Sequence, residues 1–255
     1  MNAVQKTENC TSIKPPMSKM RRLYFARLYG RILILFFCFW LAVYRPEEFQ
    51  VLKTGNFFRK ISILHVLWVI WVCDMLAQLI PIQKKLALGA KKHFSGFFIP
   101  VKEAVNAEAL RKYVVSTTKS AYKVMLLWAA LIILIGWAFV KRILGERAVF
   151  LICVFFYVCD LICVLIWCPF RLIMKTRCCT TCRIFNWDHL MMFSPLLFLR
   201  GFYTLSLLLL AVAVWVVWEL CVLMYPERFW EQSNEALRCT ACTDKLCTQY
   251  CQKLR

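Results

Sequence analysis

Five long apolar runs, joined by short basic segments, constrain the fold of this chain more than any other feature. Most of the runs approach or exceed the roughly 18–20 apolar residues that an α-helix needs to cross a bilayer. Hydrophobic residues make up 61% of the 255-residue chain, against roughly 45–50% in soluble domains. The sequence therefore predicts an all-α, polytopic membrane protein with about five transmembrane helices, at residues 23–45, 61–82, 124–140, 148–170 and 202–225.

Polar segments flank and interrupt this predicted transmembrane domain of residues 23–225. Residues 1–22 are basic, and we expect them to be disordered. The longest loop, 83–123, has apolar residues at helical spacing, which predicts an amphipathic helix on the membrane surface or against a partner. The apolar part of 183–200 has about ten residues, too few to span a bilayer, so we expect an interfacial or re-entrant piece. Residues 226–255 form a cysteine-rich tail.

The basic charge of the chain is concentrated between the apolar runs. The formal net charge is +19, which in a soluble protein would suggest binding to nucleic acid. Here the Lys and Arg residues lie in loops where they face anionic headgroups, so we expect the lipid bilayer as partner and not nucleic acid. With five crossings, the side of the N-terminus carries more Lys and Arg, which predicts a multi-pass protein with a cytoplasmic N-terminus and the tail on the opposite side.

Two short similarities suggest an internal repeat of a two-helix hairpin. The acids Asp74 and Asp160 each follow an aromatic residue, Val and Cys, and each precedes a Pro and a basic patch. Separately, the corner after residue 45 resembles the corner after residue 225, because each combines an aromatic residue, Pro-Glu and a Phe. Parallel repeats of this kind occur in membrane carriers. The repeat predicts that both Pro-Glu corners lie on the outer side of the membrane.

The tail contains four cysteines at the spacing C-x2-C-x4-C-x3-C. Four thiolates are enough for one zinc ion or one iron–sulfur cluster, and a C-x2-C pair lets two sulfurs converge on one ion. On the extracytoplasmic side, two disulfides would be the simpler interpretation, and unpaired thiols are the remaining one. The candidate ligands are Cys239, Cys242, Cys247 and Cys251.

A second cysteine cluster, Cys178, Cys179 and Cys182, lies between basic residues upstream of the tail. Neighbouring arginines are expected to lower the thiol pKa and make these cysteines reactive or competent to bind metal. Asp188 and His189 follow closely and are candidates to complete such a site. The alternative is a set of free thiols beside the membrane, open to acylation. With the two clusters on opposite sides, they could not share one metal.

Two acids, Asp74 and Asp160, fall inside apolar runs. A charge at that depth is costly, so such residues usually face the interior of a bundle and mark ion or proton binding. We expect His65 or Glu219 as their partners. The alternative is an acid that only helps the helices to pack.

The cysteines give the first functional hypothesis. It is an integral membrane protein that holds a cysteine-ligated metal or iron–sulfur centre and acts in redox or metal handling with a protein partner. A small cation- or proton-coupled carrier that uses Asp74 and Asp160 is the second hypothesis, and a scaffold with a disulfide-stapled tail is the third. With only seven Gly residues and no nucleotide-binding motif, the chain carries no self-contained catalytic motif, and whether it is an enzyme stays open.

Overall fold

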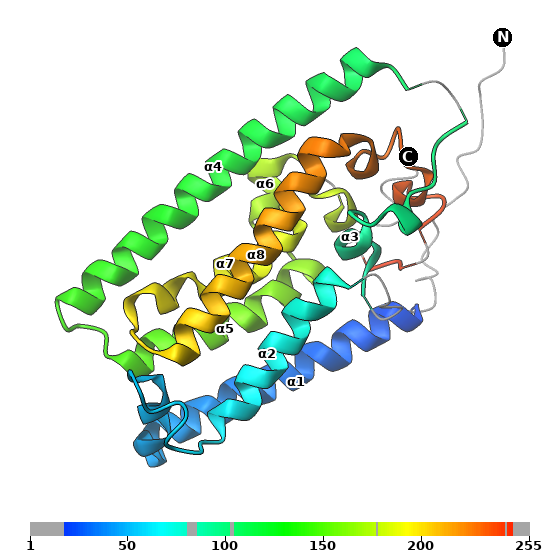
Figure 1. Ribbon diagram of the computed structural model, residues 1–255. Helices are drawn as coiled ribbons and strands as arrows, with labels where there is room; N and C mark the ends of the chain where they lie inside the picture. Colours follow the sequence, from blue (N-terminus) through cyan, green and yellow to red (C-terminus); the bar gives the residue numbers. More distant parts are fainter. Residues whose placement is uncertain (1–17, 81–85, 103–104, 177, 243, 247–255) are drawn as a thin grey trace, which may run out of the picture.

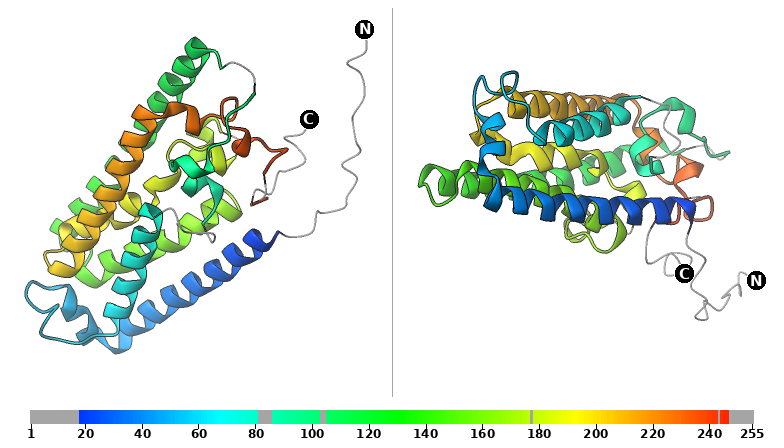
Figure 2. Two further views of the ribbon diagram at one scale, coloured as in Figure 1. Left: turned by 45° about the vertical axis from the view of Figure 1, so that its right-hand side comes forward. Right: turned by 90° about the horizontal axis from the view of Figure 1, so that it is seen from below.

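The computed structural model describes residues 18–80, 86–102, 105–176, 178–242 and 244–246. The described chain is helical, and its long helices lie side by side in one bundle (Figures 1 and 2). The β-structure found in the described residues is an isolated bridge between Pro100 and Asn234. The predicted all-α class is therefore confirmed.

Each predicted apolar run forms a helix. The five helices are α1 (Lys19–Tyr44), α2 (Leu64–Leu79), α4 (Ala107–Val140), α5 (Glu146–Leu165) and α8 (Phe202–Met224). Four of them, α1, α4, α5 and α8, are long and apolar enough to cross a membrane. Helix α2 has 16 residues and is shorter than a typical span.

Helix α4 is longer than the sequence pattern predicted. It joins most of the expected amphipathic helix of the 83–123 loop to the expected span of 124–140 in one helix of 34 residues. The Asn106 side chain caps its start by accepting hydrogen bonds from the backbone N–H groups of Glu108 and Ala109. No Gly or Pro lies between Ala107 and Ile135, so nothing in the backbone ends the helix before the apolar stretch begins.

The bundle has two ends, which we name by their contents. The loop end holds residues 45–63, the turn at 141–145 and residues 199–201, and the Thr54 hydroxyl donates to the Arg200 carbonyl there at 2.8 Å. The tail end holds the start of α1 and the described part of the tail, where the Ser18 hydroxyl donates to the Asp244 carbonyl.

A broken segment crosses the bundle between these two ends. It consists of a 3-10 turn (Phe185–Trp187), helix α7 (Asp188–Phe193) and a 3-10 helix (Ser194–Phe198). At its start, Asn186 donates to the Ala90 carbonyl at the tail end. Residues 199–201, directly after it, lie at the loop end. We call Phe185–Phe198 the crossing segment.

The crossing segment takes a different course from the one that the sequence predicted. The prediction was an interfacial or re-entrant piece, whereas the segment enters at one end of the bundle and leaves at the other. As a result α8 returns to the tail end, and the Cys178–Cys182 cluster lies at the same end as Cys239 and Cys242. So short a segment can cross because it packs against α4, α5 and α8, which shield its irregular backbone.

Close backbone approaches hold the crossing segment in place. A Cβ atom added to Gly136 of α4 would lie 2.3 Å from the Phe198 ring. A Cβ atom added to Gly201 would lie 2.2 Å from the carbonyl oxygen of Leu52. Both distances are far below van der Waals contact, so these two positions require glycine for the packing seen here.

The two Pro-Glu corners share one local structure but lie at opposite ends. Arg45 and Tyr225, which end α1 and α8, both have φ −133° and ψ 57°. Each is followed by a proline that opens a 3-10 helix, Pro46–Leu52 and Pro226–Phe229. The first corner lies at the loop end and the second at the tail end, so the prediction that they share a face is wrong.

Candidate functional site

A cluster of charged side chains lies inside the bundle. Arg31 of α1 donates from Nη1 to the Asp160 carboxylate of α5 at 2.6 Å and to the Tyr157 carbonyl at 2.7 Å. The Tyr157 ring lies 3.8 Å below the same guanidinium, and its hydroxyl donates to the Asp74 carboxylate of α2 at 3.1 Å. One arginine thus connects the two acids that the sequence singled out.

The crossing segment adds a third carboxylate to this network. Asp188 accepts a hydrogen bond from Gln78 of α2 at 3.2 Å, and its other oxygen lies 3.3 Å from Nδ1 of His189. The Asp188 and His189 side chains are 17% and 5% exposed. We call Arg31, Asp74, Tyr157, Asp160, Asp188 and His189 the polar cluster.

A small cavity of about 50 Å³ is lined by five members of the polar cluster: Arg31, Asp74, Asp160, Asp188 and His189. Tyr24 and Arg27 of α1 also line it, together with Leu86 and Ala90 from the tail end. A cavity of this size and polarity can hold water, since one water needs roughly 10–15 Å³ and two to four polar partners. The cavity is therefore large enough to hold water between the carboxylates.

The predicted partners of Asp74 and Asp160 are wrong. His65 lies at the loop end, where its ring nitrogens bond the carbonyls of Ser62 and Phe57. Glu219 accepts from both Nη atoms of Arg183 and from the Trp187 indole at 2.8 Å. Arg31 instead pairs with Asp160, Arg183 pairs with Glu219, and Asp74 accepts from the Tyr157 hydroxyl. Sequence spacing carries no information about such pairs.

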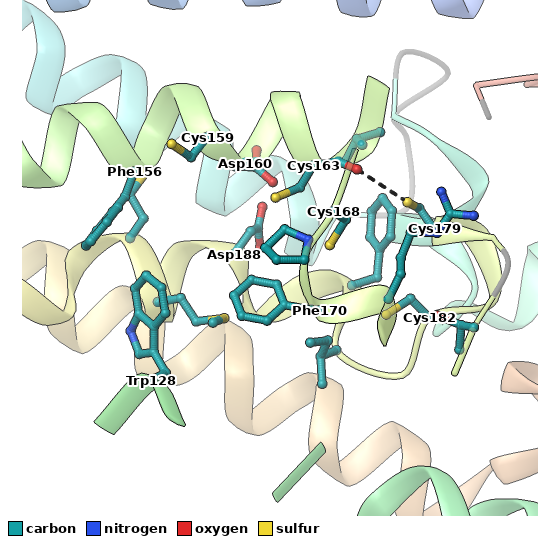
Figure 3. Close-up of a pocket in the computed structure, with 18 residues that line it drawn as sticks. Trp128, Phe156, Cys159, Asp160, Cys163, Cys168, Phe170, Cys179, Cys182 and Asp188 are labelled. Carbon is teal, nitrogen blue, oxygen red and sulfur yellow. Dashed lines mark hydrogen bonds between the residues drawn. The ribbon is translucent and has the colours of Figure 1, made fainter. Parts of the chain in front are cut away.

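A second, larger cavity of about 270 Å³ lies beside the polar cluster and shares Asp160 and Asp188 with it. Its walls come from α4, α5, α6 (Phe170–Met174) and the crossing segment, and they are largely apolar (Figure 3). Seven sulfur-bearing side chains line it: Cys159, Cys163, Cys168, Cys179, Cys182, Met191 and Met192. We call it the sulfur-lined cavity.

Burial, and not the neighbouring arginines, sets the ionisation of the Cys178–Cys182 cluster. Burial raises the pKa of Cys179 to about 12 and also raises that of Cys182. The expectation of activated thiols is therefore wrong for these two residues. Instead, a hydrogen bond from the Cys163 thiol lowers the pKa of Cys168 to about 7, helped by backbone N–H groups of Phe170 and Arg171 and opposed by burial. The sequence pattern had not distinguished Cys168 from the other scattered cysteines.

A fully buried lysine fixes the loop that carries this cysteine cluster. Lys92 donates from Nζ to the carbonyls of Thr180 at 3.0 Å and Cys182 at 2.6 Å. The same nitrogen lies 5.2 Å from the Trp218 ring and 5.5 Å from the Phe229 ring. Burial lowers the pKa of Lys92 to about 7. No sequence signal marks Lys92 for this role, because it lies among other basic residues.

The proposed metal ligands are only partly within the described chain. Cys239 and Cys242 lie at the tail end, whereas Cys247 and Cys251 fall outside the described residues. Cys178 lies near enough to Cys242 to influence its ionisation. Among the described residues, no group of three or more His, Cys, Asp or Glu side chains is arranged to hold a metal ion.

Comparisons with known proteins add no family to this geometry. No protein-family model, no curated protein and no solved structure matches the chain.

Proposed function

We propose that this chain is an integral membrane protein that binds and moves protons, as a small proton-coupled carrier, through the polar cluster. The observation that carries the proposal is the meeting of three carboxylates, Asp74, Asp160 and Asp188, inside a bundle of apolar helices. Ionisable groups at such positions are costly and usually mark ion or proton pathways.

The outer surface of the bundle supports a membrane location. Large apolar side chains such as Leu33, Leu126 and Leu209 are more than 60% exposed on three different helices. Water would make such a surface unfavourable, whereas lipid tails accept it.

The charge distribution supports an orientation with the tail end in the cytoplasm. Eight of the 33 Lys and Arg residues lie at the loop end: Arg45, Lys53, Arg59, Lys60, Lys141, Arg142, Arg147 and Arg200. More of them lie at the tail end, in α1, in the first turns of α4, in 86–102 and at Arg171, Lys175, Arg183, Arg228, Arg238 and Lys245. Under the positive-inside rule, the described N-terminal residues and the described tail then both face the cytoplasm.

Charge balance supports protons as the cargo of the polar cluster. The three carboxylates face Arg31 and Arg27 of α1 and His189 of the crossing segment, with the hydroxyls of Tyr24 and Tyr157 as neutral neighbours. The two arginines stay charged at all relevant pH values. The balance therefore depends on whether His189 or one carboxyl group holds a proton, and one proton entering or leaving changes the net charge of the site.

The packing around the polar cluster supports access from the tail end in this conformation. Leu86 and Ala90 of the tail end line the small cavity. Toward the loop end, the interior is filled by three fully buried aromatic side chains, Trp71, Phe150 and Phe193, and the Trp71 ring lies within 6 Å of the other two rings. A carrier of this design must rearrange that aromatic layer to release a proton on the other side.

Proton flux into vesicles tests the proposal. The purified protein is reconstituted in liposomes with a pH-sensitive dye inside, and a potassium diffusion potential drives protons. We expect flux above that of protein-free liposomes, and a loss of most of it in Asp74→Asn and Asp188→Asn. These two variants leave the Arg31–Asp160 pair intact, so the fold is less at risk than with Asp160→Asn.

Glu47→Gln is the matched control, because Glu47 is an exposed acid at the loop end outside the polar cluster. Its flux should equal that of the wild type. Flux no greater than in protein-free liposomes, or flux unchanged in both Asp variants with monodisperse protein, would refute the proposal.

A second candidate is the cysteine-ligated zinc or iron–sulfur centre. One observation favours it: both cysteine clusters lie at the tail end, and Cys178 lies near enough to Cys242 to influence its ionisation. A cytoplasmic tail end also favours metal ligation over stable disulfides. Anaerobic purification followed by measurement of zinc, iron and the visible spectrum tests this candidate. Protein with neither metal, and with every cysteine titrating as a free thiol, would exclude it.

A further inference from the structure

The lining of the sulfur-lined cavity is chemically selective. Five cysteines and two methionines face a space of about 270 Å³ whose other walls are mainly aromatic and aliphatic. Thiolates and thioethers are soft ligands, which prefer Cu(I), Zn²⁺ or iron–sulfur clusters over hard cations such as Mg²⁺ or Ca²⁺. The cavity therefore suits a soft metal ion better than a hard one.

Two of these thiols lie close together. Cys163 on α5 and Cys168 both line the cavity, and each influences the ionisation of the other; Figure 3 shows the two side chains next to one another. The contact arises because α5 ends at Leu165, and the N–H of Trp167 turns back to the Ile162 carbonyl at 3.1 Å. This turn brings Cys168 back beside the last full turn of the helix.

Further sulfur atoms lie around this pair. The Cys179 thiol donates to the Cys163 carbonyl at 3.7 Å. Cys159 precedes Cys163 by four residues, so both project from one face of α5 into the cavity. Arg171 lines the same cavity, so a cation lies close to these thiols.

We propose that Cys163 and Cys168 bind one Cu(I) ion in a two-sulfur site inside the sulfur-lined cavity. Binding forms two Cu–S bonds and releases the protons of the two thiols, and it requires no oxidation or reduction. The remaining cysteines and the two methionines offer sulfur atoms to which the ion can pass by ligand exchange.

The geometry distinguishes Cu(I) from Zn²⁺ at this site. Zn²⁺ in structural sites takes four ligands in a tetrahedron, and no group of three or more suitable side chains is arranged for a metal among the described residues. Cu(I) is satisfied by two thiolates. The carboxylates of Asp160 and Asp188 line the cavity but are hard ligands, and they are held by Arg31 and Gln78.

Competition against a coloured Cu(I) chelator tests the proposal on the full-length protein, reduced and kept anaerobic in detergent. We expect the variant Cys163→Ser/Cys168→Ser to lose one equivalent of bound Cu(I), and each single variant to bind that equivalent at least about 100-fold more weakly, because even changes outside the ligand set cost roughly 10–100-fold. Cys73→Ser is the matched control, because Cys73 is an exposed cysteine of α2 outside the cavity.

A second double variant, Cys239→Ser/Cys242→Ser, distinguishes Cu(I) bound by the tail cysteines from Cu(I) bound in the cavity. This variant should still bind the one equivalent of Cu(I) that we assign to Cys163 and Cys168. Equal Cu(I) binding by wild type and Cys163→Ser/Cys168→Ser would overturn the proposal, as would a Zn²⁺ affinity at this pair equal to that for Cu(I). A pair that titrates as a disulfide in protein purified under reductant would overturn it as well. The measurement is independent of proton flux, so the two proposals can fail separately.

Discussion

The guanidinium of Arg31 lies 2.6 Å from the carboxylate of Asp160, although 129 residues separate them in the chain. The side chains are 12% and 20% exposed, so both charges are largely removed from solvent. In such a pair, the loss of one partner leaves the other charge buried without compensation, which costs more than removal of both.

Single changes in this pair should therefore destabilise the protein more than the double change. We expect Arg31→Met and Asp160→Leu each to cost about 3–5 kcal/mol of folding free energy, and the double variant to recover most of that loss. Thermal unfolding in detergent, followed by loss of the monodisperse peak, measures the effect. A double variant as unstable as the sum of the two single variants would show that the pair is not coupled.

Lys92 should make stability depend on pH. The pKa of Lys92 is about 7 in the folded protein, against an ordinary value of 10.5, so the unfolded chain binds more protons between these two pH values. The free energy of unfolding should then rise as the pH increases from about 7 to about 10. The contribution of Lys92 to this rise is at most about 5 kcal/mol. Lys92→Met should flatten this part of the profile, whereas Lys102→Met, at an exposed position, should leave it unchanged. If the stability of wild type and of Lys92→Met changes with pH in the same way, the burial of Lys92 in the folded protein is contradicted.

Gly136 should tolerate no side chain. In Gly136→Ala the new methyl group would meet the Phe198 ring, and we expect a loss of about 1–3 kcal/mol from overpacking. Gly30→Ala is the matched control in α1, because no atom lies within 4 Å of its added Cβ, and it should be neutral or stabilising by up to about 1 kcal/mol. Equal unfolding midpoints for the two variants would show that the Phe198 ring does not pack against Gly136.

The crossing segment predicts that the two termini face the same side of the membrane. Epitope tags at the N-terminus and after residue 255 should both be accessible only after permeabilisation of the cell. A tag inserted at Gly55, in the loop at the other end of the bundle, should be accessible in intact cells. Tags at the two termini that react on opposite sides would restore the five-crossing arrangement.

The sequence predicted the features that depend on local hydrophobicity. It did not predict the features that depend on contacts between residues far apart in the chain. All five apolar runs became helices, because their composition alone requires burial or lipid. The crossing segment was missed because ten apolar residues cannot span a bilayer by themselves, and only its packing between α4, α5 and α8 makes the crossing possible.

The same distinction holds for the candidate sites. Asp74 and Asp160 were detectable, since a carboxylate in an apolar run stands out, and Arg31 gave a similar signal near the start of its run. Their pairing was not detectable, because it joins three helices. In the sequence, Cys163 and Cys168 occupy ordinary positions of an apolar run. Their proximity depends on the turn at the end of α5, which only the structure shows.

The crossing segment also has a consequence for the order in which the protein is made. A nascent segment of this length, with Asp188, His189 and a Ser-Pro break, would not leave the translocation channel for lipid on its own. The crossing segment can enter the bilayer only when α5 is already in place and the apolar α8, which is synthesised next, inserts together with it. If the tail end faces the cytoplasm as proposed, membrane integration of this half of the chain is a cooperative, late event, and a ribosome stalled before α8 would leave the crossing segment on the cytoplasmic side.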